Sequence, residues 1–90
     1  KFLTEKSVSV AEINAEMQKA SKGKLKGVLG FENRSLVSID FNHWPASSTL
    51  ASQETKVLPS GMARILSWYD NEWGFSNRMA DTAVKIGSLI

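Results

Sequence analysis

The hydrophobic pattern is clearest near the start of the chain, where it predicts an amphipathic helix. Ser9-Val10-Ala11-Glu12 has the form of a capping box, in which a Ser hydroxyl accepts a hydrogen bond from the amide three residues later. Behind it, apolar residues recur at helical spacing at Ile13, Met17 and Ala20. Gly23 stands where a left-handed C-terminal cap belongs. The sequence therefore predicts a helix over Val10–Lys22.

Short β-prone runs follow this helix. Gly27–Phe31 and Leu36–Phe41 are separated by the polar stretch Glu32-Asn33-Arg34-Ser35. That spacing is typical of a hairpin or of a tight connection between paired strands. Ser47–Leu50 is a further candidate strand, beginning shortly after Pro45 interrupts the pattern.

The second half of the chain predicts a turn, a strand and a helix. Gln53–Gly61 is polar and contains the turn signal Pro59-Ser60-Gly61. Met62–Tyr69 is apolar on both faces, as expected of an interior strand. After Gly74, a terminal amphipathic helix is indicated by Phe75, Met79, Val84, Ile86 and Ile90.

The order helix, strands, helix indicates an α+β fold rather than alternating parallel units. We expect a mainly antiparallel or mixed sheet of about four strands, with one helix on the N-terminal side and one at the C-terminus. Ninety residues suit a single small domain, which we take as residues 1–90.

The charge balance raises nucleic-acid binding as an alternative function. The net charge is +2 and the pI is about 9.1. The densest basic group lies near the predicted helix end and comprises Lys19, Lys22, Lys24 and Lys26. Cations there favour the negative end of the helix dipole, whereas a polyanion site needs a continuous basic patch. We therefore expect no nucleic-acid partner.

Composition excludes other classes of site. The chain has no cysteine, so neither a disulfide nor a cysteine-based metal site is expected, and we predict no metal ligand at all. No apolar run approaches the roughly 20 residues of a membrane span, and the first ten residues do not resemble a signal peptide. The absence of cysteine is compatible with a reducing cytosol.

One segment, Ser67–Arg78, carries most of the chemical information. It places two Trp, one Tyr and one Phe among Asp, Asn, Glu and Arg side chains, where the predicted strand meets the terminal helix. Flat apolar surfaces beside fixed hydrogen-bonding groups are what a ligand pocket requires. An Asn side chain there offers an acceptor and a donor that match a ligand amide. Alternatively, the aromatic residues belong to the core and Asp70-Asn71 is turn chemistry.

The segment Ser-Trp-Tyr-Asp-Asn-Glu-Trp-Gly-Phe-Ser-Asn-Arg at 67–78 closely resembles the C-terminal signature of phosphorylating glyceraldehyde-3-phosphate dehydrogenases. Other motifs follow in the family's order: Glu12-Ile13-Asn14-Ala15, Leu25-Lys26-Gly27-Val28-Leu29-Gly30, Leu36–His43, Ser47-Ser48-Thr49 and Thr55-Lys56-Val57. The resemblance covers nearly the whole chain and is nearest to the bacterial or plastid type. Erythrose-4-phosphate dehydrogenase shares much of the pattern. We therefore expect the C-terminal part of a catalytic domain, without the Rossmann domain.

The resemblance assigns a cofactor role to four residues. It implies that Asn71 hydrogen-bonds the carboxamide of the nicotinamide ring of NAD or NADP. It places Phe75 close to that ring, where stacking survives the loss of the hydroxyl that a Tyr would carry. Tyr69 lies near the reaction centre as a supporting residue, and Glu72 is a pocket-lining candidate. Asp70, Trp73 and Arg78 are expected to hold the junction together.

In the resembled family a Cys thiolate attacks the aldehyde, a His assists, hydride passes to the dinucleotide, and phosphate releases the thioester. None of the family's catalytic groups matches a residue here, so we assign no catalytic residue and expect the chain to be inactive alone. His43 belongs to the family's Asp-Phe-Asn-His segment, and we expect a loop role for it. The chain departs from the family at Trp44 and in Gln53–Met62.

The resemblance also implies partners. These are the remainder of the dehydrogenase chain and further copies in a homo-oligomer formed through the sheet, in the cytoplasm or a plastid. Two alternatives remain open. One is a stand-alone oligomerisation or binding module derived from that domain, and the other is part of an erythrose-4-phosphate dehydrogenase.

Overall fold

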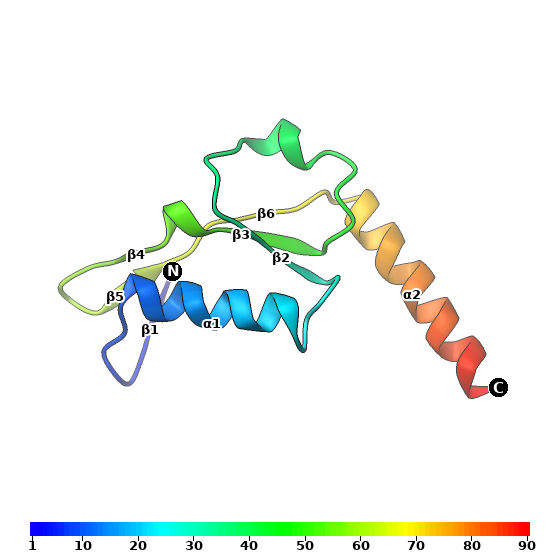
Figure 1. Cartoon of the computed structure of the whole chain (residues 1–90), viewed down its shortest axis with the longest axis horizontal. Coiled ribbons are helices and arrows are strands. Elements are labelled where there is room, and N and C mark those ends of the chain that lie inside the picture. Colours follow the sequence, from blue (N-terminus) through cyan, green and yellow to red (C-terminus); the bar gives the residue numbers. More distant parts are fainter.

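The computed structural model describes residues 1–90, and helix α1 occupies Val10–Lys22 as the sequence pattern predicts (Figure 1). The Ser9 hydroxyl accepts from the Glu12 amide at 3.1 Å. The prediction of a left-handed cap at Gly23 is wrong, because this residue has φ −114° and ψ −108°. The chain instead continues through further turns, with Leu25 donating to the Ala20 carbonyl, and the left-handed residue is Gly27 at φ 82°.

One sheet holds the most buried side chains and has the strand order β2-β3-β6. Strands β2 (Leu29–Glu32), β3 (Ser48–Ala51) and β6 (Ser67–Trp68) form it, with β2 parallel to β3 and β3 antiparallel to β6. The predicted strand at Ser47–Leu50 is thus confirmed within one residue. Leu50, at the centre of the sheet, is fully buried.

The predicted pairing of Gly27–Phe31 with Leu36–Phe41 is wrong. Residues 33–47 instead form a long crossover, which parallel strands require. It contains a 3-10 helix at Ser38–Phe41, where Asp40 accepts a hydrogen bond from the Val37 amide at 2.8 Å. That local bond competes with extended structure. Within Leu36–Phe41 only Phe41 is buried, so most of the apolar side chains that suggested a strand do not pack in the core.

The second sheet is antiparallel and has the order β1-β5-β4. It is built from β1 (Phe2–Leu3), β5 (Met62–Arg64) and β4 (Lys56–Val57), with a 3-10 turn at Ser52–Glu54 leading into β4. The single strand predicted at Met62–Tyr69 is therefore two strands in different sheets. The turn expected around Pro59 is present and links β4 to β5, and Gly61 adopts φ 93°.

Helix α2 (Trp73–Leu89) projects away from both sheets, as the orange-to-red helix in Figure 1 shows. Gly74 is its only buried residue. Neither helix is long and apolar enough to cross a membrane. The α+β class, with mixed strand pairing, an N-terminal-side helix and a C-terminal helix, is thus confirmed. The strands, about four by prediction, are short and fall into two three-stranded sheets.

Candidate functional site

The junction between β6 and α2 is organised by the carboxylate of Asp70. Its Oδ1 atom accepts from the amides of Trp73 at 2.7 Å and Glu72 at 3.0 Å. Its Oδ2 atom accepts from the His43 amide at 3.0 Å. The backbone hydrogen bonds from Trp73, His43 and Glu72 lower the pKa of Asp70 below its ordinary value. One carboxylate therefore fixes both the first turn of α2 and the loop that carries His43, as expected for a junction residue.

His43 has the loop role that the sequence predicts. It has φ 59°, the only non-glycine residue with a left-handed backbone. The centroids of the His43 and Trp73 rings lie 5.1 Å apart. The His43 backbone amide also donates a hydrogen bond to the Asp70 carboxylate. These contacts hold the loop against the start of α2.

A cavity of about 250 Å³ lies beside this junction. Three of the four predicted cofactor residues, Tyr69, Asn71 and Phe75, line it. Glu72 does not line the cavity. Its backbone amide instead donates a hydrogen bond to the Asp70 carboxylate within the turn. The cofactor role of all four residues stays a prediction, but the structure brings three of them to one hollow.

The aromatic residues of the junction divide into two groups. Trp68 faces the core, where it stacks on the buried Phe41 with ring centroids 6.0 Å apart. Tyr69 and Phe75 are 66% and 65% exposed, so they are not core residues. Trp68 is therefore a structural aromatic residue, in line with the alternative interpretation of this segment. That interpretation does not account for Tyr69 and Phe75 at the cavity. Trp44, where the chain departs from the resembled family, packs edge-on against Phe41.

Arg78 ties the cavity wall to the rest of the molecule. Its Nη1 atom donates to the Gly27 carbonyl at 2.8 Å and to the Ser47 hydroxyl at 3.3 Å. Its Nε atom lies 3.0 Å from the Asp81 carboxylate. Because α2 has few other tertiary contacts, these bonds fix the direction in which it leaves the junction.

Ser47 is a cavity residue that the sequence interpretation missed. It reaches the cavity because Gly74 allows α2 to approach the loop closely. A Cβ atom at position 74 would lie 3.0 Å from the Ala46 carbonyl oxygen. The sequence did contain a signal for this close approach, because Gly74 stands in the first turn of the helix immediately before Phe75.

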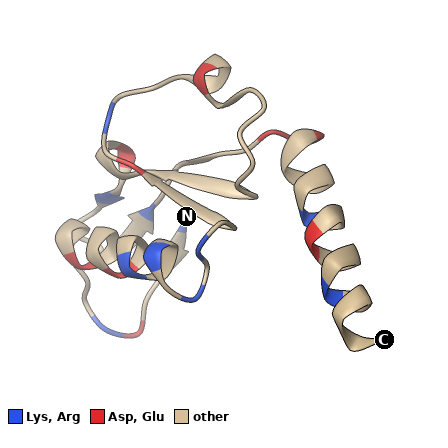
Figure 2. Cartoon of the chain, turned by 45° about the vertical axis from the view of Figure 1, so that its right-hand side comes forward, with Lys and Arg blue, Asp and Glu red and all other residues tan.

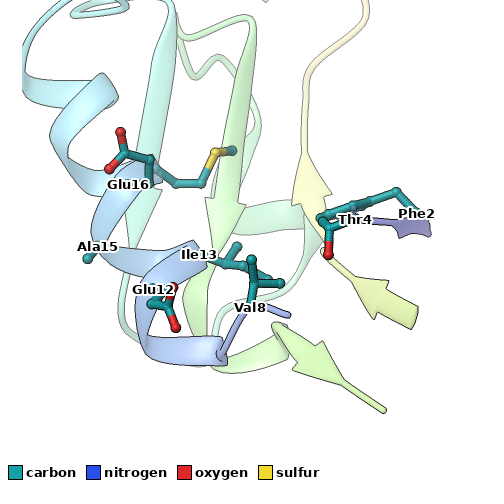
Figure 3. A pocket seen from close by; sticks show the side chains of 8 residues that line it. Phe2, Thr4, Val8, Glu12, Ile13, Ala15 and Glu16 are labelled. Atoms are coloured by element: carbon teal, nitrogen blue, oxygen red, sulfur yellow. The ribbon is translucent and has the colours of Figure 1, made fainter. Parts of the chain in front are cut away.

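The largest cavity, about 520 Å³, lies elsewhere, between α1 and the N-terminal segment. Figure 3 shows the side chains of Phe2 and Thr4 across from those of α1. Its lining is mostly apolar, with the carboxylates of Glu12 and Glu16 at its edge, and it contains no amide side chain. It therefore lacks the combination of amide and exposed rings that distinguishes the junction cavity.

Replacing Asp70 with Asn is expected to flatten the dependence of stability on pH. Because folding lowers the pKa of Asp70, the ionised carboxylate stabilises the fold at pH values above its ordinary pKa of 3.8. That contribution is lost as the pH falls through the lower folded-state pKa. Melting temperatures measured from about pH 6 to about pH 2 should fall more steeply for the parent than for Asp70→Asn.

The comparison of the two proteins isolates this residue. Glu32, whose pKa is lowered to about 2 by its hydrogen bonds to the Arg34 side chain and amide, titrates in both proteins. Equal pH slopes for the parent and Asp70→Asn would contradict the proposed role of the Asp70 carboxylate.

The family described as "Glyceraldehyde 3-phosphate dehydrogenase, C-terminal domain" matches residues 1–71 of this chain. The glyceraldehyde-3-phosphate dehydrogenase of Cereibacter sphaeroides is 56% identical over 89 residues, covering 99% of this chain and 27% of that protein. The enzyme of Xanthobacter flavus is 54% identical over 89 residues, with the same coverage. The chromosomal enzyme of Cupriavidus necator is 48% identical over 85 residues, covering 94% of this chain and 25% of the relative. The chain thus spans about a quarter of the length of these relatives, and it belongs to the glyceraldehyde-3-phosphate dehydrogenase family, to whose C-terminal domain it corresponds.

Proposed function

We propose that this chain forms the nicotinamide-contacting part of a glyceraldehyde-3-phosphate dehydrogenase, with Asn71 as the residue that reads the ring's carboxamide. The observation that carries this proposal is the cavity at the start of α2, where Asn71 lies beside two exposed aromatic rings. Asp70 accepts the hydrogen bonds that hold the turn. The side-chain amide of the exposed Asn71 is therefore available to bind a ligand.

The residues present fit a nicotinamide ring. A carboxamide carries one acceptor and one NH₂ donor group, and the Asn71 side chain offers the complementary pair. Phe75 and Tyr69 provide flat apolar surfaces at the same cavity, and either can cover one face of a planar ring. Arg78 has its guanidinium engaged by Gly27, Ser47 and Asp81, so it acts as a fixed wall.

The reaction that we propose for the whole enzyme is phosphorylating oxidation of glyceraldehyde 3-phosphate, in glycolysis or the Calvin cycle. NAD or NADP, when bound, supplies the hydride acceptor. The chain has no cysteine to act as nucleophile, so its contribution is orientation of the cofactor and support of the sheet. The remainder of a dehydrogenase chain is the partner that this role requires, in the cytoplasm or a plastid. Erythrose 4-phosphate is the alternative substrate.

Two measurements test this proposal. The chain alone should give no NADH formation with glyceraldehyde 3-phosphate, NAD and phosphate, and clear turnover would contradict it. A hybrid in which this chain replaces the matching segment of the Cereibacter sphaeroides enzyme should be active. In that hybrid, Asn71→Ala should raise KM for NAD by about 3- to 10-fold, as expected for the loss of hydrogen bonds to a ligand amide.

Asn77→Ala provides the matched control for Asn71→Ala. Asn77 lies on α2, where its side-chain amide donates to the Trp73 carbonyl at 2.8 Å, and it does not line the cavity. The same chemical change at position 77 should leave KM for NAD within about twofold of the unmodified hybrid. If Asn71→Ala and Asn77→Ala raise KM for NAD equally, the proposed cofactor role of Asn71 is wrong.

Self-association is the second candidate function, and the exposed apolar side chains favour it. Leu3 on β1 is 69% exposed, and Phe75, Met79 and Ile86 on α2 are each more than half exposed. Such surface, when contiguous, marks an interaction site. We propose that the chain forms a homo-oligomer through its sheet, at the edge strand where Leu3 is exposed, with the exposed apolar side chains of α2 as a second contact. Sedimentation over a range of concentrations should show reversible association, and a monomer at every concentration would count against it.

A further inference from the structure

The Ser47 hydroxyl lines the junction cavity and carries a hydrogen-bond donor that the proposed function does not use. Its Oγ atom accepts a hydrogen bond from the Arg78 Nη1 atom at 3.3 Å. A serine hydroxyl also has one O–H donor, and no atom of the chain accepts a hydrogen bond from it here. The cavity therefore holds a free donor beside the side chain of Asn71.

Contacts from two sides hold Ser47 in place. Its backbone amide donates to the Val28 carbonyl at 2.8 Å, immediately before β3 begins. Arg78, which donates to its hydroxyl, is itself bound to the Gly27 carbonyl and to the Asp81 carboxylate. Figure 2 shows this basic position of α2 beside the acidic one. A group that is already fixed loses little conformational entropy when a ligand binds to it.

The bond from Arg78 also makes the Ser47 hydroxyl a stronger donor. Hydrogen bonds in a chain polarise one another, and a cationic donor at the oxygen polarises the O–H bond further. The other hydroxyl at the cavity belongs to Tyr69, whose side chain is 66% exposed and has no hydrogen-bond partner to fix its direction. Ser47, which is half-buried, is thus the preorganised donor of this cavity.

We propose, building on the proposed function, that the Ser47 hydroxyl donates a hydrogen bond to the carboxamide oxygen of the nicotinamide ring. A carboxamide oxygen has two lone pairs, so it can accept from Ser47 while the carboxamide NH₂ group donates to the side-chain oxygen of Asn71. The Asp70 oxygens at the same cavity already accept three backbone amides. Ser47 then determines specificity for a ring substituent that carries an acceptor oxygen.

Isothermal titration calorimetry of the hybrid enzyme with three dinucleotides tests this assignment. The 3-acetylpyridine analogue of NAD keeps the carbonyl oxygen but lacks the NH₂ group, whereas the thionicotinamide analogue replaces the oxygen with sulfur, a weak acceptor. Ser47→Ala should raise Kd for NAD and for the acetylpyridine analogue about 3- to 10-fold, the size of one neutral hydrogen bond. It should change Kd for the thionicotinamide analogue by less than about twofold, because little of that bond exists to be lost.

Ser48→Ala is the matched control, because it makes the same change one residue later, on β3, at a side chain that does not line the cavity. It should leave all three Kd values unchanged. An equal rise of all three Kd values in Ser47→Ala would overturn the proposal, since it would mean that losing the contact with Arg78 merely loosens the cavity wall. An unchanged Kd for NAD in Ser47→Ala would overturn it as well.

Asn71→Ala, titrated in the same series, separates this inference from the proposed function. If Asn71→Ala weakens NAD binding and Ser47→Ala does not, only the contact from Ser47 is wrong. If neither variant changes Kd for NAD, the proposed function of the cavity is wrong too.

Discussion

Leu50→Ala is expected to lower the free energy of unfolding by about 2–5 kcal/mol, the usual cost of emptying a core position. Leu50 is the largest side chain that is fully buried, and its strand β3 is the central strand of the sheet. Few other apolar side chains are buried, namely Phe41, Ala46, Ala51 and Ala63, so little can move in to fill the space. Such a loss is a large fraction of the stability of a chain of this size.

Urea unfolding followed by Trp fluorescence measures this loss, because Trp68 pairs with β3 and stacks on Phe41. Leu89→Ala makes the same change at a position on α2 that is 74% exposed. It should alter the free energy of unfolding by less than about 0.5 kcal/mol. If both variants unfold at the same urea concentration as the parent, the assignment of Leu50 to the core is wrong.

Gly30→Ala is expected to destabilise the chain by about 1–3 kcal/mol through overpacking. Gly30 on β2 pairs with Thr49 on β3, and a Cβ atom at position 30 would overlap the Thr49 hydroxyl and methyl groups. Thr49 is only 2% exposed, so its side chain has no open space to enter. The melting temperature measured by circular dichroism should fall accordingly.

A double mutant identifies the cause of that loss. Thr49→Ala removes the overlapping atoms, and the Thr49 hydroxyl has no hydrogen-bond partner to lose. Gly30→Ala combined with Thr49→Ala should therefore be more stable than the sum of the single changes predicts. Gly87→Ala is the control, because a Cβ atom there meets nothing within 4 Å and α2 should gain up to about 1 kcal/mol. Strict additivity at positions 30 and 49 would argue against overpacking.

The local elements of the fold could be predicted because their signals lie within a few residues. The capping box at Ser9 and the periodic apolar residues fix α1, and Gly74 with the residues after it indicates α2. The parallel pairing of β2 with β3 could not be predicted, because the hairpin signal at 32–35 was local whereas the true partner follows a long crossover. The break between β5 and β6 depends on which sheet each half joins, and no local pattern encodes that choice.

The candidate site was predictable in part for the same reason. Tyr69, Asn71 and Phe75 lie within one short segment, so a single motif gathered them. Ser47 comes from a distant loop and reaches the cavity only through its contact with Arg78 and the close approach at Gly74.

The projection of α2 has a consequence for how the chain opens. A helix anchored only at its N-terminal end derives its stability beyond Arg78 from local propensity, and isolated helical segments shorter than about 12–15 residues are marginal in water. We expect its backbone amides beyond Arg78 to exchange with deuterium through local fraying, at a free energy well below that of the sheets. The chain then has two cooperative units, and a single melting temperature describes only the one that contains Leu50.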